Sequence, residues 1–476
     1  MKNTLQQLTA LITLALALTL SLRAQNDALA GNWLARLEFN GSTLRLVLKI
    51  VANSDGSLIA KLDSLDQGAR DLPMDEITQE GDTLRFVAQK LGLHYEGKLN
   101  LKGAEIAGTL KQGGGALPLV FRRTAVAPTL HRPQDPLPPY PYHEEEVSYK
   151  NENENVKLAG TLTFPRDGKR HPAVLLITGA GAQDRNETIA GHRPFLVLAD
   201  ALTRAGIAVL RVDDRGVGGS DAGVPNPTSE NYVEDVLAGI AYLKTRQEIA
   251  PQQIGLIGHS EGGMIAPLAA VRSSDVAFIV LLAGGGQPGT ELIYTQTALQ
   301  QKKNGVAASV TAQTIAAQQQ LFAILQAEPE NTSAEKKLRA CLQQQLEKLP
   351  ADQRAAFASG KATLEAQIPL FLSAWFRYFI AYDPRPTLVK VKVPVLALNG
   401  ENDVQAAAKE NLSLIAAALK AGGNRDYTIQ SFPKLNHLFQ TSETGLPHEY
   451  ERSEETIAPA VLTTITNWIL QRTHQR

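Results

Sequence analysis

QQIGLIGHSEGGMIAPLAA, residues 252–270, places one serine between glycines, after an apolar run and before a run of small residues. The apolar run predicts a buried strand and the small-residue run predicts a helix, so Ser260 falls at a sharp turn between them. Gly258 and Gly262, two residues to either side, allow the strand and the helix to approach closely. Such a turn points the serine hydroxyl out of a sheet, beside the N-terminus of a helix. We therefore interpret Ser260 as a nucleophile, the alternative being a passive serine in a glycine-rich turn.

Strands and helices alternate on both sides of this stretch, from about residue 143 onward. Runs rich in Val, Ile and Leu, such as PAVLLITGAG at 172–181, alternate with amphipathic helical runs, such as YVEDVLAGIAYLKT at 232–245. This alternation predicts a mostly parallel sheet with helices on both faces. It stops at about 287–386, where Ala, Gln, Leu and Lys predominate. These residues favour helices, so we expect a helical insert that lies over the sheet.

Residues 26–126 have a different pattern, with short alternating runs separated by turn residues at intervals of about ten. This spacing predicts a small all-β barrel or meander, and the opening AGNWLARLEF resembles lipocalin-like β-barrels. We expect a packing, substrate-presenting or stabilising module. Residues 127–142 are rich in proline, which removes backbone donors and favours extended chain, so they are expected to be a linker to the domain of alternating strands and helices at 143–476.

The first residues predict export. Residues 1–24 combine Lys2 with an apolar stretch from about 8 to 22, which indicates a secretory signal peptide, with an uncleaved anchor as the alternative. We expect a periplasmic or extracellular protein without stable membrane insertion after cleavage. Cys341 is the only cysteine, so no intramolecular disulfide can form. The formal net charge is −1 and no basic cluster is present, which argues against a nucleic-acid partner.

A serine hydroxyl becomes an effective nucleophile only when a base takes its proton. In the chain order serine, acid, histidine, the acid would follow a later strand. VPVLALNGEND at 393–403 predicts such a strand and ends with two carboxylates. We favour Asp403, a few residues beyond the strand, and retain Glu401 as the alternative.

Only three histidines follow this acid, His437, His448 and His474. His437 lies in FPKLNHLFQ, a predicted loop before the final helix, whereas His448 is in a polar loop and His474 is in the tail. His437 is therefore the candidate base. His259 adjoins Ser260, but neighbouring residues on a tight turn point apart, so we expect a packing or hydrogen-bonding role for it.

Two backbone N–H groups would have to stabilise an oxyanion. Glu261, the residue after the nucleophile, supplies one, and the loop ITGAGAQDRNE at 177–187 supplies the other. Ala180 is the favoured second donor and Gly181 the next, because Gly179 and Gly181 let the backbone approach a substrate closely.

Two further loop segments are candidates for supporting roles. Gln183 and Arg185 either lock the shape of the 177–187 loop by hydrogen bonds or are simply solvated. In DDRGVGGSD, Asp214 and Arg215 are expected to pair and brace a second loop. That segment lacks the lysine of a phosphate-binding loop, so a nucleotide site is not expected.

GHSEGG, NGENDVQ and LNHLFQ, in that order, resemble the α/β-hydrolase superfamily, and more narrowly the bacterial serine esterases related to S9/S33 peptidase-like hydrolases. TGAGAQDRNE and DDRGVGGS resemble the corresponding loops of those esterases, although Thr178-Gly179 replaces the common His-Gly opening. The resemblance covers about residues 143–472. It implies a triad of Ser260, Asp403 and His437, a cap formed by the insert after the sixth strand, and hydrolysis of small carboxylic esters, with short acyl chains expected.

Two other functions remain open from the sequence. A peptidase would need acidic residues to bind a free amine, and the insert offers Glu328, Glu330 and Glu335. Alternatively, the β module binds a ligand or glycan and the remainder is inert. Neither a metal nor an organic cofactor is expected, because spacings such as H-E-x-x-H are absent from the sequence.

Overall fold

The computed structural model describes residues 29–39, 42–53, 55, 57–65, 69–100, 102, 104–112, 115–125, 131–348, 365 and 367–473. The chain divides into two compact units, Met1–His131 with Ile189–His192, and Arg132–Thr188 with Arg193–Arg476. The predicted signal peptide lies outside the described residues, so export stays a prediction.

The first unit is an antiparallel sheet in which strands pair with their neighbours in the chain and the last strand returns to the first. The sheet order is β4-β3-β2-β1-β9-β8-β7-β6-β5. The elements are β1 (Gly31–Phe39), β2 (Ser42–Ala52), β3 (Leu58–Ser64), β4 (Ala69–Pro73), β5 (Glu76–Glu80), β6 (Thr83–Ala88), η2 (Gln89–Leu91), β7 (Leu93–Asn100), β8 (Glu105–Gln112) and β9 (Gly115–Thr124).

Large side chains fill the concave core of this unit. Trp33, Phe86, Tyr95 and Phe121 are buried, and the rings of Phe86 and Tyr95 stack with centroids 4.8 Å apart. The Tyr95 hydroxyl donates to the carbonyl of Ile106 and the Trp33 indole N–H donates to that of Leu29, both at 2.9 Å, so both polar groups of this aromatic cluster are satisfied. The alternating residues of the strands thus form a packed core, as predicted for a small all-β barrel or meander.

The second unit contains an eight-stranded sheet in the order β10-β11-β13-β12-β14-β15-β16-β17. β10–β11 and β11–β13 pair antiparallel, and the remaining neighbours pair parallel. The strands are β10 (His143–Asn151), β11 (Val156–Phe164), β12 (His171–Ile177), β13 (Ala208–Val212), β14 (Ile249–His259), β15 (Phe278–Leu282), β16 (Val395–Gly400) and β17 (Tyr427–Phe432).

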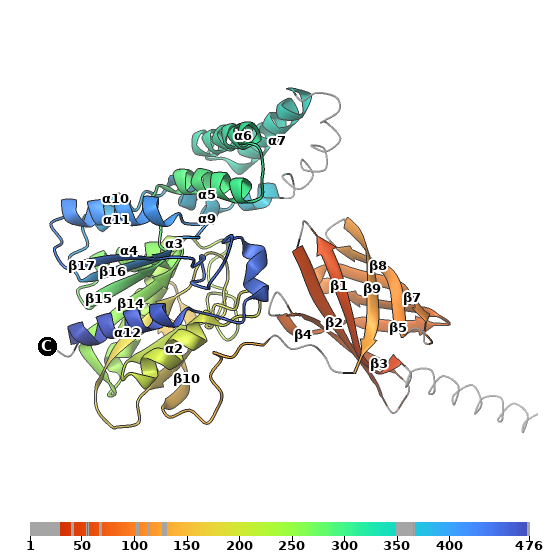
Figure 1. The fold of residues 1–476 in the computed structure, drawn as a ribbon, viewed down its shortest axis with the longest axis horizontal. Helices are drawn as coiled ribbons and strands as arrows, with labels where there is room; N and C mark the ends of the chain where they lie inside the picture. Colours follow the sequence, from red (N-terminus) through yellow and green to blue (C-terminus); the bar gives the residue numbers. More distant parts are fainter. Residues whose placement is uncertain are drawn as a thin grey trace, which may run out of the picture. The chain divides into compact units, whose positions relative to one another are not determined.

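Helices cover both faces of this sheet, and each face has its own apolar core (Figure 1). One face packs against α2 (Pro194–Arg204) and α12 (Pro459–Thr473). The other face packs against α3 (Ser229–Thr245), α4 (Gly262–Arg272), α10 (Arg385–Leu388) and α11 (Ala408–Ala421). The 3-10 helix η3 (Pro447–Arg452) precedes α12.

The insert between β15 and β16 is helical, as the sequence predicts. It contains α5 (Gly289–Lys303), α6 (Ala308–Ala327), α7 (Asn331–Lys348) and α9 (Ala374–Ala381). These helices share a separate apolar cluster that includes Leu321, Phe322 and Phe376. Figure 1 shows α5, α6 and α7 stacked beyond the sheet on the side of α10 and α11.

Residues 132–142 precede β10 within the second unit. Their side chains hold them against the rest of that unit by hydrogen bonds to backbone carbonyls near its C-terminus. Arg132 donates to the carbonyl of Ser453 at 2.8 Å, and Gln134 donates to that of Ile457 at 2.7 Å. Asp135 pairs with Arg193 at the start of α2 at 2.8 Å.

Among the described residues, no helix is both long enough and apolar enough to cross a bilayer.

Candidate active site

Ser260 occupies a sharp turn between β14 and α4, as predicted. Its φ is +53°, a left-handed conformation that costs energy in a residue with a side chain. The Ser260 N–H donates to the carbonyl of Leu282 at the end of β15, at 2.8 Å. A Cβ atom on Gly258 would lie 2.0 Å from the carbonyl oxygen of Gly262, so only glycine fits there. The close approach of β14 and α4 fixes the backbone of the serine.

Asp403 and His437 form a buried hydrogen-bonded pair. Asp403 lies just after β16 and its Oδ2 is 2.7 Å from His437 Nδ1. The other oxygen of Asp403 accepts from the backbone N–H groups of Gln405 and Ala406, at 2.7 and 2.8 Å. With Nδ1 bonded to the carboxylate, the free ring nitrogen of His437 is Nε2.

The alternatives to this pair lie elsewhere. Glu401 accepts from the Ser431 hydroxyl at 2.8 Å and is exposed. His448 belongs to the exposed surface of η3, and His474 lies outside the described residues.

Ser260 and His437 line one cavity of about 400 Å³, together with Ala180 and Glu261. This volume is within the range of small-molecule sites. The remainder of the wall is mainly apolar and comes largely from the insert, including Leu292, Ile293, Leu321, Phe322, Leu370, Phe371, Trp375, Phe376 and Phe379. The insert therefore covers the cavity that contains the serine and the histidine.

The predicted oxyanion donors lie in the same cavity. Ala180 and Glu261 line it, whereas Gly181 lines a second, smaller cavity behind the loop. Among the described residues, neither the N–H of Ala180 nor that of Glu261 has an intramolecular acceptor. The N–H of Gly179 is already used, because it donates to Glu187 Oε1 at 2.7 Å. The geometry is consistent with Ala180 and Glu261 as the available donors.

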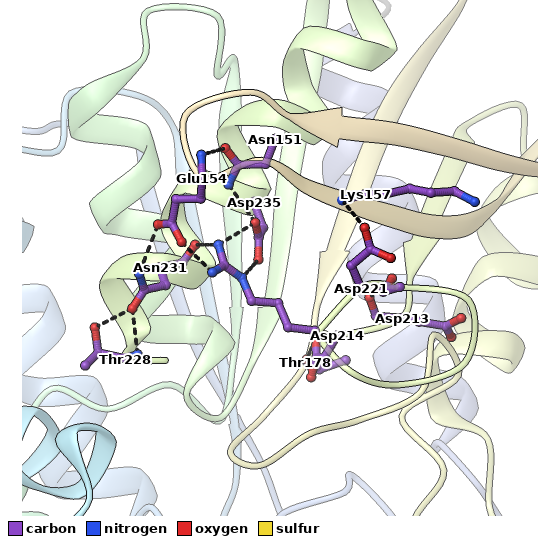
Figure 2. Close-up of polar contacts among 12 residues, drawn as sticks. Asn151, Glu154, Lys157, Thr178, Asp213, Asp214, Asp221, Thr228, Asn231 and Asp235 are labelled. Carbon is purple, nitrogen blue, oxygen red and sulfur yellow. Dashed lines mark hydrogen bonds and ion pairs between the residues drawn. The ribbon is translucent and has the colours of Figure 1, made fainter. Parts of the chain in front are cut away.

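Buried carboxylates shape the 177–187 loop from behind. Asp214 Oδ2 accepts from the Thr178 hydroxyl and from the Gln183 N–H, both at 2.9 Å. Arg185 forms a bidentate pair with Asp213, at 3.0 and 2.7 Å. Thr178, Asp213 and Asp214 lie close together in Figure 2. Arg185 thus links this loop to its neighbour, whereas the partly exposed Gln183 side chain donates to the carbonyl of Ala180 within the loop at 3.3 Å.

Arg215 does not pair with Asp214, contrary to the expectation from the sequence. Its guanidinium donates to both oxygens of Asp235 in α3, at 2.6 and 2.8 Å, and also to Glu154. Glu154 and Asp235 face one another, with Asn231 beside Glu154, in Figure 2. Side chains of consecutive residues diverge here, so Asp214 points to the 177–187 loop and Arg215 points to α3.

The Glu261 side chain has contacts that the sequence does not reveal. It is buried and accepts from the Ser229 hydroxyl at 2.6 Å and from the Trp375 indole N–H at 2.9 Å. Burial raises the pKa of the Glu261 carboxyl, and the two hydrogen bonds only partly oppose this. Trp375 lies in α9, so this bond joins the insert to the turn that contains Ser260. An aromatic residue more than a hundred positions away gives no local signal of such a contact.

These features together define an α/β-hydrolase: a mostly parallel sheet, a strained serine between strand and helix, and a later Asp–His pair. The family model described as "Serine aminopeptidase, S33" matches residues 193–443, and the chain belongs to this family. It is therefore a hydrolase. The predicted α/β-hydrolase fold with a preceding all-β module is confirmed.

Individual proteins resemble the chain more distantly. Esterase EstD of Thermotoga maritima is 23% identical over 364 residues, which cover 76% of each protein. Among solved structures, a Pyrococcus furiosus esterase is 16% identical with a TM-score of 0.42, covering 70% of this chain and 91% of its own. The α/β-hydrolase GrgF from a Penicillium species is 15% identical with a TM-score of 0.43, covering 69% and 99%.

The burial of Asp214 predicts a pH-dependent stability. Burial raises the pKa of this carboxyl to about 7, despite the opposing hydrogen bonds from Gln183 and Thr178. The folded chain therefore holds this proton up to about pH 7, whereas the unfolded chain loses it near pH ~4. Between these values the folded state binds more protons, so this group lowers the free energy of unfolding as pH rises. Asp214→Asn removes the effect, and its Tm relative to the unmodified chain should increase from about pH 4 to pH 7.

Thermal unfolding followed across this pH range measures the difference. Asp221→Asn is the control, because it makes the same substitution at an exposed position of the same loop. A Tm difference for Asp214→Asn that stays constant with pH would contradict the prediction.

Proposed function

We propose that the chain is a serine esterase that cleaves small carboxylic esters through Ser260, His437 and Asp403. The single observation that carries the proposal is the buried Asp403–His437 hydrogen bond beside a cavity that His437 shares with the strained Ser260. An aspartate bonded to Nδ1 holds the imidazole in the tautomer whose Nε2 can accept a proton.

In this mechanism His437 Nε2 takes the hydroxyl proton of Ser260 as the oxygen attacks the ester carbonyl. The N–H groups of Glu261 and Ala180 stabilise the oxyanion, and Asp403 stabilises the imidazolium. The imidazolium then gives its proton to the leaving alcohol, which produces an acyl-enzyme. Water then attacks the acyl carbonyl as His437 takes its proton, and the imidazolium returns that proton to the Ser260 oxygen as the acyl–oxygen bond breaks and the acid leaves. The protein's own groups supply every proton transfer in this sequence.

A second candidate is an aminopeptidase-like activity. One observation favours it: the Glu261 carboxylate lines the cavity and has no basic partner among the described residues. The acidic residues expected from the insert do not line that cavity. Glu328 pairs with Lys337, and Glu335 pairs with Arg339 at 2.7 Å. An amine-bearing substrate would therefore have to use Glu261, which already accepts from Trp375 and Ser229.

Ser260 should react with a fluorophosphonate probe. Attack by the serine oxygen on phosphorus gives a stable covalent adduct, so the unmodified chain should be labelled and Ser260→Ala should not. In-gel fluorescence after incubation with the probe measures the labelling. An unlabelled wild-type chain would contradict the proposal and favour an inert binding protein.

Asp403 should be essential for turnover, whereas Glu401 should not. Asp403→Asn would favour the wrong tautomer of His437, and kcat should fall by about 10⁴-fold. Glu401→Gln is the matched control, because that carboxylate bonds only to Ser431 at the surface among the described residues. Steady-state kinetics with p-nitrophenyl butyrate measures both. Loss of kcat in Glu401→Gln with retention in Asp403→Asn would contradict the assignment.

Short-chain esters should be better substrates than amides. We expect kcat/KM to be highest for p-nitrophenyl acetate or butyrate, lower for longer acyl chains, and lowest for aminoacyl p-nitroanilides, because the leaving group of an amide is poorer. A panel of these substrates measures the order. Higher kcat/KM for the anilides, lost selectively in Glu261→Gln, would support the aminopeptidase instead.

A further inference from the structure

Two buried ionisable side chains outside the triad lie directly behind it. Glu187 follows the oxyanion loop and has only 1% of its surface exposed, and His259, the residue before Ser260, has 5% exposed. Both belong to the second unit. The esterase mechanism above uses neither of them, and isolated ionisable groups at this depth would be unfavourable without partners.

The side chains of Glu187 and His259 form a continuous series of hydrogen bonds from the 177–187 loop to the backbone of His437. Glu187 Oε1 accepts from the Gly179 N–H at 2.7 Å and lies 2.8 Å from His259 Nδ1. The other ring nitrogen of His259, Nε2, lies 3.0 Å from the backbone carbonyl oxygen of His437. Both nitrogens of one imidazole therefore face oxygen atoms.

The bonding partners determine where the protons lie. A backbone carbonyl only accepts, so His259 Nε2 must carry a hydrogen. Glu187 Oε1 accepts from the Gly179 N–H and the same oxygen faces Nδ1 at 2.8 Å, so Nδ1 is the donor in this second contact. Burial opposes the charge on the His259 imidazole, but the charge and hydrogen bond of Glu187 outweigh it and raise the pKa of His259. His259 and Glu187 thus form a buried hydrogen-bonded pair that also contacts the main chain of His437.

The pair meets three parts of the site at once. Gly179 precedes the oxyanion donor Ala180, His259 precedes Ser260, and the carbonyl that His259 bonds belongs to His437 itself. The rings of His259 and His437 lie with centroids 4.9 Å apart. Asp403 holds His437 through the side chain, whereas His259 holds it through the main chain.

We propose that Glu187 and His259 are positioning residues that hold the main chain of His437 and the oxyanion loop in register with Ser260. This inference rests on the proposed esterase function. Without the Nε2 bond, the His437 loop can shift relative to the serine, and a displacement near 1 Å in a reacting group can cost about 100-fold in rate.

Two amide substitutions distinguish the two hydrogen bonds of His259, the one with Glu187 and the one with the His437 carbonyl. In His259→Gln the side-chain NH₂ takes the place of Nε2 and can still donate to the His437 carbonyl. In His259→Asn the NH₂ takes the place of Nδ1, so it keeps the bond to Glu187 and loses the bond to His437. We expect kcat for p-nitrophenyl butyrate to fall by about 100-fold in His259→Asn with KM unchanged. His259→Gln should retain most of the wild-type kcat.

Glu187→Gln tests the contacts of Glu187 with Gly179 and His259. It keeps the shape of the side chain and an oxygen for both contacts, but it removes the charge through which Glu187 strengthens its hydrogen bond with His259 and raises the pKa of that imidazole. We expect kcat to fall between the values for the two His259 variants, again with little change in KM. Circular dichroism and Tm establish that each variant is folded.

His171→Gln and His171→Asn are the matched controls. His171 is also buried and also lies between a backbone carbonyl, that of Gly206 at 3.1 Å, and a carboxylate, Asp167 at 2.8 Å. It begins β12, whereas the oxyanion loop follows the end of that strand. These variants should keep wild-type kcat and KM.

The outcomes separate the two proposals. Wild-type chain that neither cleaves the ester nor reacts with fluorophosphonate overturns the esterase function. An active wild type with equal kcat losses in His259→Asn and His259→Gln, or with no loss in either, overturns the positioning role alone. Loss of folded protein in Glu187→Gln and both His259 variants would also overturn it, because the pair would then serve folding.

Discussion

The active site depends on the close contact between the glycines that flank Ser260. With Gly258 and Gly262 in contact, β14 passes into α4 within three residues, and Ser260 must adopt a positive φ. That conformation directs its N–H to Leu282 in the neighbouring strand and leaves the hydroxyl at the edge of the sheet. Backbone strain of this kind persists only where the surrounding packing determines it. The parallel sheet therefore provides more than a scaffold, because it holds the serine in its strained conformation.

Three carboxylates lie around the 177–187 loop, the buried Glu187 and Glu261 and the half-buried Asp214, and uncompensated negative charge there would oppose the proposed oxyanion. The structure compensates each of them differently. Glu187 Oε1 lies 2.8 Å from Nδ1 of the His259 imidazole, and this contact raises the pKa of that imidazole. Burial raises the pKa values of Asp214 and Glu261, so these groups take up protons more readily than exposed acids. The carboxylates can thus order the loop through hydrogen bonds while contributing less net negative charge than their number implies.

The sequence predicts those parts of the site that depend on local pattern and chain order. Ser260, Asp403 and His437 can be predicted because each follows a strand that the sequence pattern indicates. The predicted pairing of Arg215 with Asp214 is wrong, because the side chains of adjacent residues diverge. The actual partner, Asp235, is brought to Arg215 only by the tertiary fold. The sequence does not predict strand β10, because its acidic run lacks alternation and because the Glu145–Arg246 ion pair joins residues about a hundred positions apart. Contacts between residues so far apart in the chain leave no periodic pattern in the sequence.

The insert is coupled to the reaction centre through one side chain. Glu261 presents its backbone N–H to the cavity beside Ser260, while its carboxylate accepts from Trp375 in the insert and from Ser229 at the start of α3. Displacing α9 would remove the indole donor and leave a buried acceptor less satisfied, at a cost of about 1–3 kcal/mol. The contact of α9 with the turn that contains Ser260 is thereby favoured by the same residue whose backbone N–H lies beside the cavity. In the proposed esterase, a bulky acyl group that displaces Trp375 would act directly on this residue, and acyl size would then be linked to oxyanion stabilisation through Glu261.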